Sequence, residues 1–219
     1  MKNVRRLDKP PSLDKHGENW TEQLLKEIDK VRGHISKVPE SSFIKYNTDD
    51  VKSTLYNMYD ALCCYCEERV GVVEYANIEH RKPKRKFPGS TYEWDNMHLS
   101  CTTCNTQKGD KYNKKYPILD AVLDNPIEEH LEYKVSDSDG VYLSWKTKRG
   151  ETTVEDTDLN RPRLKEQRSY VCARVLQVIL AIKRAPHSSR ARRAKANLLI
   201  QSKGRYGSMI RYFMKQNNV

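Results

Sequence analysis

The sequence predicts an α+β fold, and three observations lead to that class. Apolar residues recur at helical spacing near both ends of the chain, over residues 20–38 and 164–182. Between them, two Cys-x-x-Cys pairs enclose a stretch that suggests short strands and loops. Residues 131–145 read "LEYKVSDSDGVYLSW", in which two β-rich runs flank a turn sequence, as in a hairpin.

The first fifty residues predict an extended segment followed by a helix, and we assign residues 1–50 to an N-terminal unit. Residues 1–19 contain Pro10-Pro11 and mixed charges, a composition typical of chain that becomes ordered only against something else. The helical spacing of residues 20–38 then ends at a proline. This unit is a candidate docking element for a partner protein.

Residues 51–125 form the predicted central unit, which holds most of the residues able to do chemistry. Asp49 and Asp50 begin a helix whose apolar face leads directly into the first cysteine pair. After it, residues 70–80 predict a short strand or hairpin, and the Pro and Gly content of residues 81–90 predicts a loop. The residues after the second cysteine pair predict a helix start or a tight turn.

Residues 126–219 form the predicted C-terminal unit, a β-hairpin followed by a basic helical region. The helix over residues 164–182 ends before Pro186. Residues 189–203 predict a second helix, which is basic, and residues 206–215 a last turn or helix.

Positive charge is concentrated in this C-terminal unit. The chain has 40 Lys and Arg against 29 Asp and Glu, a formal net charge of +11. Glu166 is the last acidic residue, and twelve of the basic residues follow it. Such asymmetry indicates a polyanionic partner, with nucleic acid as the leading candidate and a solubilising basic surface as the alternative. The candidate nucleic-acid-binding residues of this region are Arg190, Arg192, Arg193 and Lys195.

Membrane insertion and secretion are not expected. No apolar run approaches the ~20 residues that span a bilayer. The basic start of the chain lacks the apolar centre of a secretory signal. We therefore expect a cytoplasmic protein, in which cysteines serve metal binding more often than disulfide formation.

The two cysteine pairs have the spacing of a tetrahedral zinc site. Cys63 and Cys66 form the first pair, and Cys101 and Cys104 the second, so each turn offers two thiolates from one side. Cys64 is an extra thiol that could replace Cys63 as the ligand. A redox pair is the weaker alternative, because it needs only one such motif and a thioredoxin-like context.

The order of the residues between and after these pairs resembles the HNH endonuclease family. The segments that carry the likeness are "CCYCEE", "NIEHRKPK" and "WDNMHLSCTTCNTQKG", within about residues 60–112. The resemblance implies a ββα-metal unit with two zinc-binding cysteine pairs around its active site. More narrowly, the segments are similar to the small HNH proteins of Septu antiphage and retron-linked defence systems, the PtuB group. A downstream stretch, "EDTDLNRPRLKEQR", resembles those proteins more loosely.

The resemblance also implies roles for individual residues. His80 corresponds to the general base, and Glu79 and Asn105 to the ligands of one Mg²⁺ or Mn²⁺ ion, for which their hard oxygens are suited. Asn96 corresponds to a residue that holds the His80 loop through side-chain-to-backbone hydrogen bonds. We assign Lys108 to a phosphate contact, with a solvated lysine as the alternative.

Because neighbouring residues on a strand point to opposite faces, Glu79 and His80 need a bend or twist to reach one phosphate. Asn105 stands where the oldest form of the motif has a histidine.

The sequence supports three hypotheses about the function. The leading one is a metal-dependent nuclease of an antiphage defence complex, with DNA favoured as substrate and RNA, including tRNA, as a further candidate. A second is a non-catalytic zinc module that holds nucleic acid, and a third is an assembly subunit with a degenerate nuclease unit. By the same resemblance, the partner would be an ABC- or SMC-like ATPase of the PtuA kind. A retron reverse transcriptase and its DNA–RNA product are further candidates.

Overall fold

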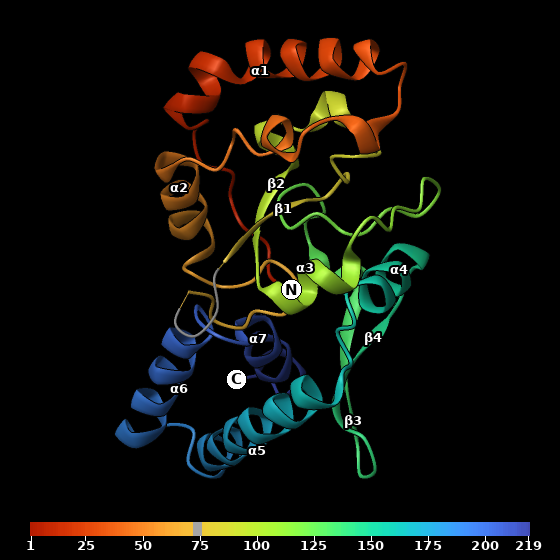
Figure 1. The fold of residues 1–219 in the computed structure, drawn as a ribbon. Coiled ribbons are helices and arrows are strands. Elements are labelled where there is room, and N and C mark those ends of the chain that lie inside the picture. Colours follow the sequence, from red (N-terminus) through yellow and green to blue (C-terminus); the bar gives the residue numbers. More distant parts are fainter. Residues whose placement is uncertain (72–75) are drawn as a thin grey trace.

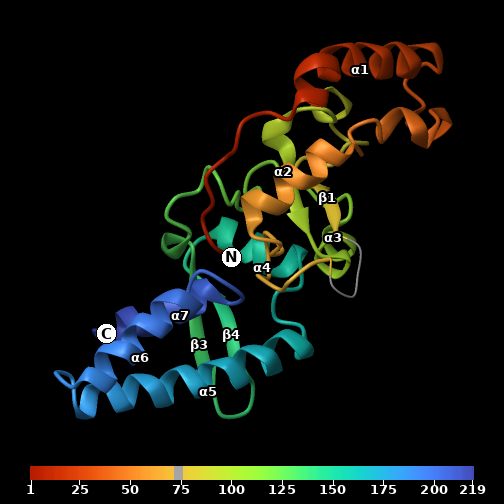
Figure 2. The ribbon, with the colours of Figure 1, turned by 90° about the vertical axis from the view of Figure 1, so that its left-hand side faces the viewer.

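Two small antiparallel sheets organise the chain, which is the α+β class that the sequence predicts. The computed structural model describes residues 1–71 and 76–219. β1 (Asn77–His80) pairs with β2 (Met97–Ser100), and β3 (Leu131–Ser136) pairs with β4 (Gly140–Trp145). Helices cover both sheets, and the first and the last helical layers lie at opposite ends of an elongated molecule (Figures 1 and 2).

The first helix starts earlier than the sequence analysis expected. α1 spans Pro11–Lys30, so residues 11–19 are helical rather than extended. Proline suits the first helical position because its missing N–H would have no partner there. The helix ends at Lys30 because Gly33, at φ 78°, turns the chain and donates its N–H to the Ile28 carbonyl. The expected helix over residues 31–38 is reduced to one 3₁₀ turn at Ile35–Lys37.

α2 carries the chain to the first cysteine pair, as predicted. A 3₁₀ turn at Glu40–Phe43 precedes it, and α2 spans Asp49–Tyr59 with Thr48 before its first turn. Its buried face holds Val51, Leu55, Met58 and Tyr59 and packs on β2. The two aspartates lie in the first turn, where a helix N-terminus favours negative charge.

The central strands and the helix that follows them form a strand–strand–helix unit. The register of β1 and β2 places Glu79 opposite His98 and His80 opposite Met97. α3 (Thr102–Lys108) begins directly after β2. Of the strand or hairpin expected over residues 70–80, the structure places residues 77–80 in β1, and residues 72–75 lie outside the described residues. Short 3₁₀ turns at Pro88–Ser90 and Trp94–Asn96 lead from β1 to β2.

The C-terminal hairpin forms where the sequence predicts it, and helices pack on its β4 strand. α4 (Lys148–Asp156) was not expected, and the Thr147 side chain caps it by accepting the Gly150 N–H. Residues 162–216 contribute α5 (Pro162–Arg184), α6 (Ser189–Gln201) and α7 (Gly207–Gln216). At the hairpin turn Gly140 has φ 70°, and a Cβ there would lie 2.3 Å from Ser169 Oγ on α5. The close approach of hairpin and helix therefore requires glycine.

The downstream stretch that resembles the PtuB group joins the start of α5 to β4. The Asn160 side chain donates to the Leu143 carbonyl and accepts from the Leu143 N–H, both at 2.8 Å. Leu159 and Leu164 are buried, and the buried guanidinium of Arg168 donates to the Leu159 carbonyl at 2.6 Å. The residues of this stretch thus pack the C-terminal unit together.

Two glutamates in the cysteine loop connect the central unit to the C-terminal helices. Glu67, which directly follows Cys66, is buried and accepts the Ser208 N–H at 3.0 Å. Glu68 forms an ion pair with Arg205 at 2.6 Å. The turn between α6 and α7 is therefore anchored on the loop that bears Cys63 and Cys66. None of the helices in the described residues is both long and apolar enough to cross a membrane.

A buried polar cluster surrounds His98 on β2. The Tyr59 hydroxyl and His98 Nδ1 share a hydrogen bond at 2.6 Å, and Nε2 lies 3.7 Å from Asp120, which pairs with Arg81 at 3.1 Å. Burial lowers the pKa of His98 to about 3, although Asp120 opposes the shift. His98 is therefore neutral in the folded protein and has a structural position.

We expect His98 to make the protein less stable in mild acid. In the unfolded chain the imidazole takes up a proton below about pH 6.5, whereas the folded form resists it down to its depressed pKa. The contribution of His98 to the unfolding free energy is thus present above pH 6.5. Protonation of this group in the unfolded chain lowers the unfolding free energy by about 1.4 kcal/mol by pH 5.5. Urea unfolding at pH 8 and 5.5, with excess zinc, should show a smaller loss for His98→Gln. An equal loss in both proteins would contradict the assignment.

Candidate active site

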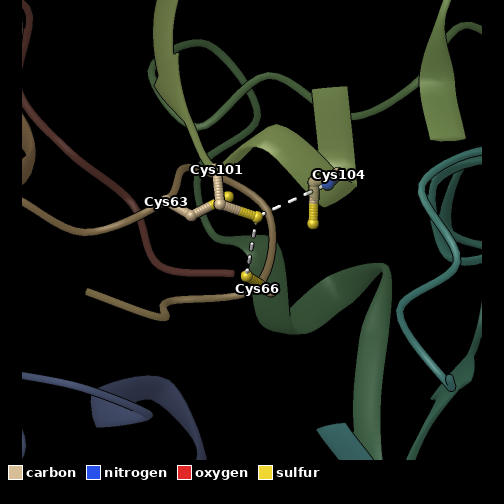
Figure 3. Close-up of side chains that lie close together, drawn as sticks. All are labelled: Cys63, Cys66, Cys101 and Cys104. Carbon is tan, nitrogen blue, oxygen red and sulfur yellow. Dashed lines mark hydrogen bonds between the residues drawn. The ribbon is translucent and has the colours of Figure 1, made fainter. Parts of the chain in front are cut away.

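The four cysteines of the two pairs form one cluster. The sulfurs of Cys63, Cys66, Cys101 and Cys104 all lie within 4.8 Å of one another (Figure 3). Cys66 Sγ and Cys101 Sγ are 3.8 Å apart, and four sulfurs bonded tetrahedrally to zinc at about 2.3 Å would be about 3.8 Å apart. Cys64 is outside the cluster, and its backbone N–H donates to the Leu99 carbonyl on β2. The residues therefore fit zinc, with Cys63 rather than Cys64 in the ligand position.

The cluster fixes the start of α3. Cys101 precedes the helix, and its sulfur accepts the Cys104 N–H at 3.4 Å, as an N-cap residue does. The neighbouring thiols, Cys104 first, donate hydrogen bonds that lower the pKa of Cys101. Arg161, just before α5, points a guanidinium nitrogen at Cys104 Sγ at 3.5 Å and so brings positive charge to the thiolates. Because Asn105 is the next residue of α3, its position depends on this cluster.

A cleft of about 610 Å³ brings together three of the predicted site residues. Glu79 and His80 line it from the end of β1, and half-buried Asn105 lines it from α3. Both strand neighbours thus face one cleft, as the sequence analysis required of them. The side chains of Glu79, His80 and Asn105 can therefore act on the same bound ligand.

His80 is held as a neutral base. Its Nε2 lies 2.9 Å from the Thr91 carbonyl, which can only accept, so Nε2 carries the proton and Nδ1 keeps its lone pair. Burial lowers the pKa of His80 to about 4, and Lys84 and Lys108 contribute to the shift. The Tyr46 ring packs edge-on against the imidazole at 4.6 Å. The imidazole is therefore oriented and unprotonated at neutral pH.

Asn96 makes the side-chain-to-backbone hydrogen bonds expected of it. Its amide nitrogen donates to the carbonyls of Lys82 and Ser90, at 3.0 and 2.9 Å, and its oxygen accepts the Lys82 N–H at 2.7 Å. Three bonds thus close the loop between His80 and Thr91 from within. Asn96 is a positioning residue, because it holds the loop that supplies the partner of His80 Nε2.

Lys108 lies in an unexpected place. Its ammonium is 2.6 Å from Glu79 Oε1 and donates to the His80 carbonyl at 2.7 Å, and both side chains of the ion pair are 2% exposed. The alternative of a solvated lysine is therefore wrong. Burial raises the pKa of Glu79, whereas Lys108 and the hydroxyl of Tyr65, 3.3 Å away, favour its charged form. Lys108 acts on Glu79 and His80 from inside the protein.

Glu79 and Asn105 fit a hard divalent cation. Both line the cleft and carry side-chain oxygens, and Glu79 Oε2 makes no hydrogen bond with any residue of 1–71 or 76–219. A carboxylate and an amide oxygen with water are a donor set that Mg²⁺ and Mn²⁺ accept and that zinc does not prefer. The two metal sites predicted from the sequence are thus separate, one of sulfur and one of oxygen donors.

The basic residues predicted for nucleic-acid binding on α6 lie away from the cleft. Arg190, Arg192, Arg193 and Lys195 are exposed. Figures 1 and 2 both show α6 at one end of the molecule, whereas β1 and α3 lie in its middle. The structure therefore does not bring these four residues to the cleft.

Several residues of the site were not predicted from the sequence. Tyr65 contacts Glu79, and its place between Cys64 and Cys66 in the quoted motif was a usable signal. Arg161 lies in the downstream stretch of looser resemblance, but nothing in that pattern pointed to a cysteine. Thr91 contributes only a carbonyl group, which any residue has, so no side-chain signal could have found it.

Metal analysis of two neighbouring cysteine variants will test the sulfur cluster. We expect about one tightly held zinc per chain in the wild-type protein. Cys64→Ser should keep this zinc after dialysis, whereas Cys63→Ser should lose it, because only Cys63 belongs to the cluster. Both residues are buried, so each variant controls for the other. Zinc lost from Cys64→Ser but kept by Cys63→Ser would reverse the assignment.

Removal of the Lys108 ammonium should destabilise the protein. Lys108→Met leaves Glu79 buried without its cation, a change that costs about 3–5 kcal/mol for buried pairs. Lys114→Met, at an exposed site, should change the unfolding free energy by less than about 0.5 kcal/mol.

Urea unfolding with zinc present measures the unfolding free energy of Lys108→Met and of Lys114→Met. The double variant Lys108→Met/Glu79→Gln should recover part of the loss seen in Lys108→Met. Equal stability of Lys108→Met and Lys114→Met would contradict the role of the ion pair.

Comparison with known proteins agrees with this geometry. The model of the HNH endonuclease family matches residues 63–111. The Septu protein PtuB of Bacillus mycoides (strain KBAB4) is 30% identical over 161 residues, which cover 59% of this chain and 53% of that protein. The Septu protein PtuB of Bacillus thuringiensis is 32% identical over 112 residues, 51% of this chain and 41% of that protein.

The retron Vc95 HNH protein of Vibrio cholerae (serotype O1, biovar El Tor) is 29% identical over 150 residues, 63% of this chain and 70% of that protein. The chain spans about half the length of the Septu relatives that it matches. The family match covers both cysteine pairs and every predicted active-site residue. The chain therefore contains an HNH endonuclease domain, with a four-cysteine cluster that fits zinc, and it resembles the Septu PtuB proteins.

Proposed function

We propose that this protein is a metal-dependent nuclease that hydrolyses phosphodiester bonds as part of an antiphage defence complex. The observation that carries the proposal is the orientation of His80 in the cleft that Glu79 and Asn105 also line. Nε2–H is bound to Thr91, so Nδ1 is the atom that takes a proton from the attacking water.

Each side chain has a part in this scheme. Asn96 holds the loop that orients His80, and Tyr65 and Lys108 favour the charged form of Glu79 against the effect of burial. Glu79 and Asn105 would hold a Mg²⁺ or Mn²⁺ ion, which, when bound, supplies positive charge at the phosphate. DNA is the favoured substrate, and RNA, including tRNA, is the alternative.

The partner we propose is an ABC- or SMC-like ATPase, by analogy with the Septu proteins, with a retron reverse transcriptase and its DNA–RNA product as further candidates. The support is the likeness to the Septu and retron relatives. The exposed basic surface of α6 gives this chain a place for polyanion contact outside the cleft.

Cleavage assays on plasmid DNA and total tRNA, in Mg²⁺ or Mn²⁺ and with or without the operon partner, will test the activity. His80→Ala should lower the rate by about 10²–10⁴-fold, the usual contribution of a general base. Asn105→Ala should lose cleavage and keep its zinc. His34→Ala changes an exposed histidine and is the matched control. Equal cutting by the wild-type protein and His80→Ala would refute the mechanism and favour a non-catalytic zinc module.

A further inference from the structure

One wall of the cleft comes from outside the HNH match. The family model begins at residue 63, yet Ile44, Tyr46, Asn47 and Lys52 also line the cleft. They belong to the end of the N-terminal unit and the first turn of α2. The cleft is therefore completed by a segment that the HNH domain does not supply.

The lysines that line the cleft differ in their partners. Lys108 is paired with buried Glu79, and Lys84 is paired with Glu40 at 2.8 Å. Lys52 is half-buried, and its ammonium forms no ion pair or hydrogen bond with residues 1–71 or 76–219. Within the described part of the chain, Lys52 therefore brings a positive charge without an ion-pair partner to the wall that faces β1 and α3.

Lys84 lies beside the base. Its ammonium is 5.7 Å from the centroid of the Tyr46 ring, and that ring packs on His80 at 4.6 Å. The positive charge of Lys84 contributes to the low pKa of His80, after burial. A phosphate next to His80 would thus lie near Lys84.

Glu40 forms ion pairs with two cationic side chains at this edge of the cleft. One of its oxygens accepts from Lys84 and the other from Arg85, and its side chain is 52% exposed. The hydrogen bond from Lys84 is the main cause that lowers the pKa of Glu40. Carboxylate and phosphate oxygens bind the same Lys and Arg donors. An exposed ion pair of this kind is weak, so a polyanion can replace the carboxylate.

We propose that Lys52 and Lys84 bind backbone phosphates of the nucleic acid in the cleft, and that phosphate displaces Glu40 from Lys84 when the strand binds. This inference rests on the proposed function and adds the residues that hold its substrate. It assigns α2, which precedes the residues that the HNH family model matches, a direct part in substrate binding.

Binding without cleavage will test the proposal. Full-length protein with His80→Ala is titrated against fluorescently labelled single-stranded and duplex DNA oligonucleotides over a series of salt concentrations. Lys52→Ala and Lys84→Ala should each weaken binding and lower the salt slope by about 0.7 to 0.9, the effect of one lost phosphate contact. Lys52→Arg should restore binding, which excludes a folding defect as the cause.

Two further variants make the test specific. Glu40→Gln should tighten binding, because it removes the competitor of phosphate at Lys84. Lys37→Ala, at an exposed lysine that does not line the cleft, should change neither affinity nor slope. Equal affinity and slope for Lys52→Ala and Lys37→Ala would overturn the role of Lys52. Weaker binding by Glu40→Gln would show that the Glu40–Lys84 pair is a support and would overturn the displacement.

The binding test is independent of the proposed activity. A protein that cuts no substrate but binds DNA through Lys52 and Lys84 would retain this inference and refute the nuclease. A protein that cuts DNA while all five variants bind alike would retain the nuclease and refute this inference.

Discussion

The four-cysteine cluster is the interaction on which the rest of the site depends. The cysteines come from two segments far apart in sequence, one after α2 and one at the start of α3. In a chain with 37% hydrophobic residues, metal–thiolate bonds can replace apolar burial that the sequence lacks. The cluster sets the direction of α3, and α3 supplies both Asn105 and Lys108. The cluster thereby determines where the proposed reacting groups lie.

The buried charge of the site is neutralised by an ion pair and not by solvent. Glu79 is almost fully buried, and a carboxylate there is costly unless a cation accompanies it. Lys108 supplies that cation and also binds the carbonyl of His80, so one side chain restrains two neighbouring residues. His80 and His98 are both kept neutral by burial, but of the two only His80 lines the cleft. The same physical effect thus accompanies a proposed catalytic role at one residue and packing at the other.

Much of the site could be predicted from the sequence because its residues lie close together in a short motif. The resemblance of short segments to the HNH family indicated Glu79, His80, Asn96 and Asn105, and their roles remain proposals. The ion pair of Lys108 could not be predicted, because spacing on a helix says which face a residue takes and not whether that face is buried. α1 was misplaced for a local reason, since Pro10-Pro11 reads as extended chain although proline is also a good first helical residue. The wall of the cleft that Ile44, Tyr46, Asn47 and Lys52 form could not be predicted, because it depends on tertiary contacts that no short motif encodes.

The contact between Glu67 and Ser208 has a consequence for how such proteins can be dissected and recombined. Glu67 is buried beside a cysteine of the cluster, and α7 provides the backbone N–H that accompanies its charge. A fragment cut before α7 would keep the proposed reacting groups but would lose this donor and the apolar cover of Met209, Ile210 and Phe213. The HNH unit of this chain is therefore not a portable module. Its C-terminal helices are part of the same folding unit, and changes in one must be matched by changes in the other.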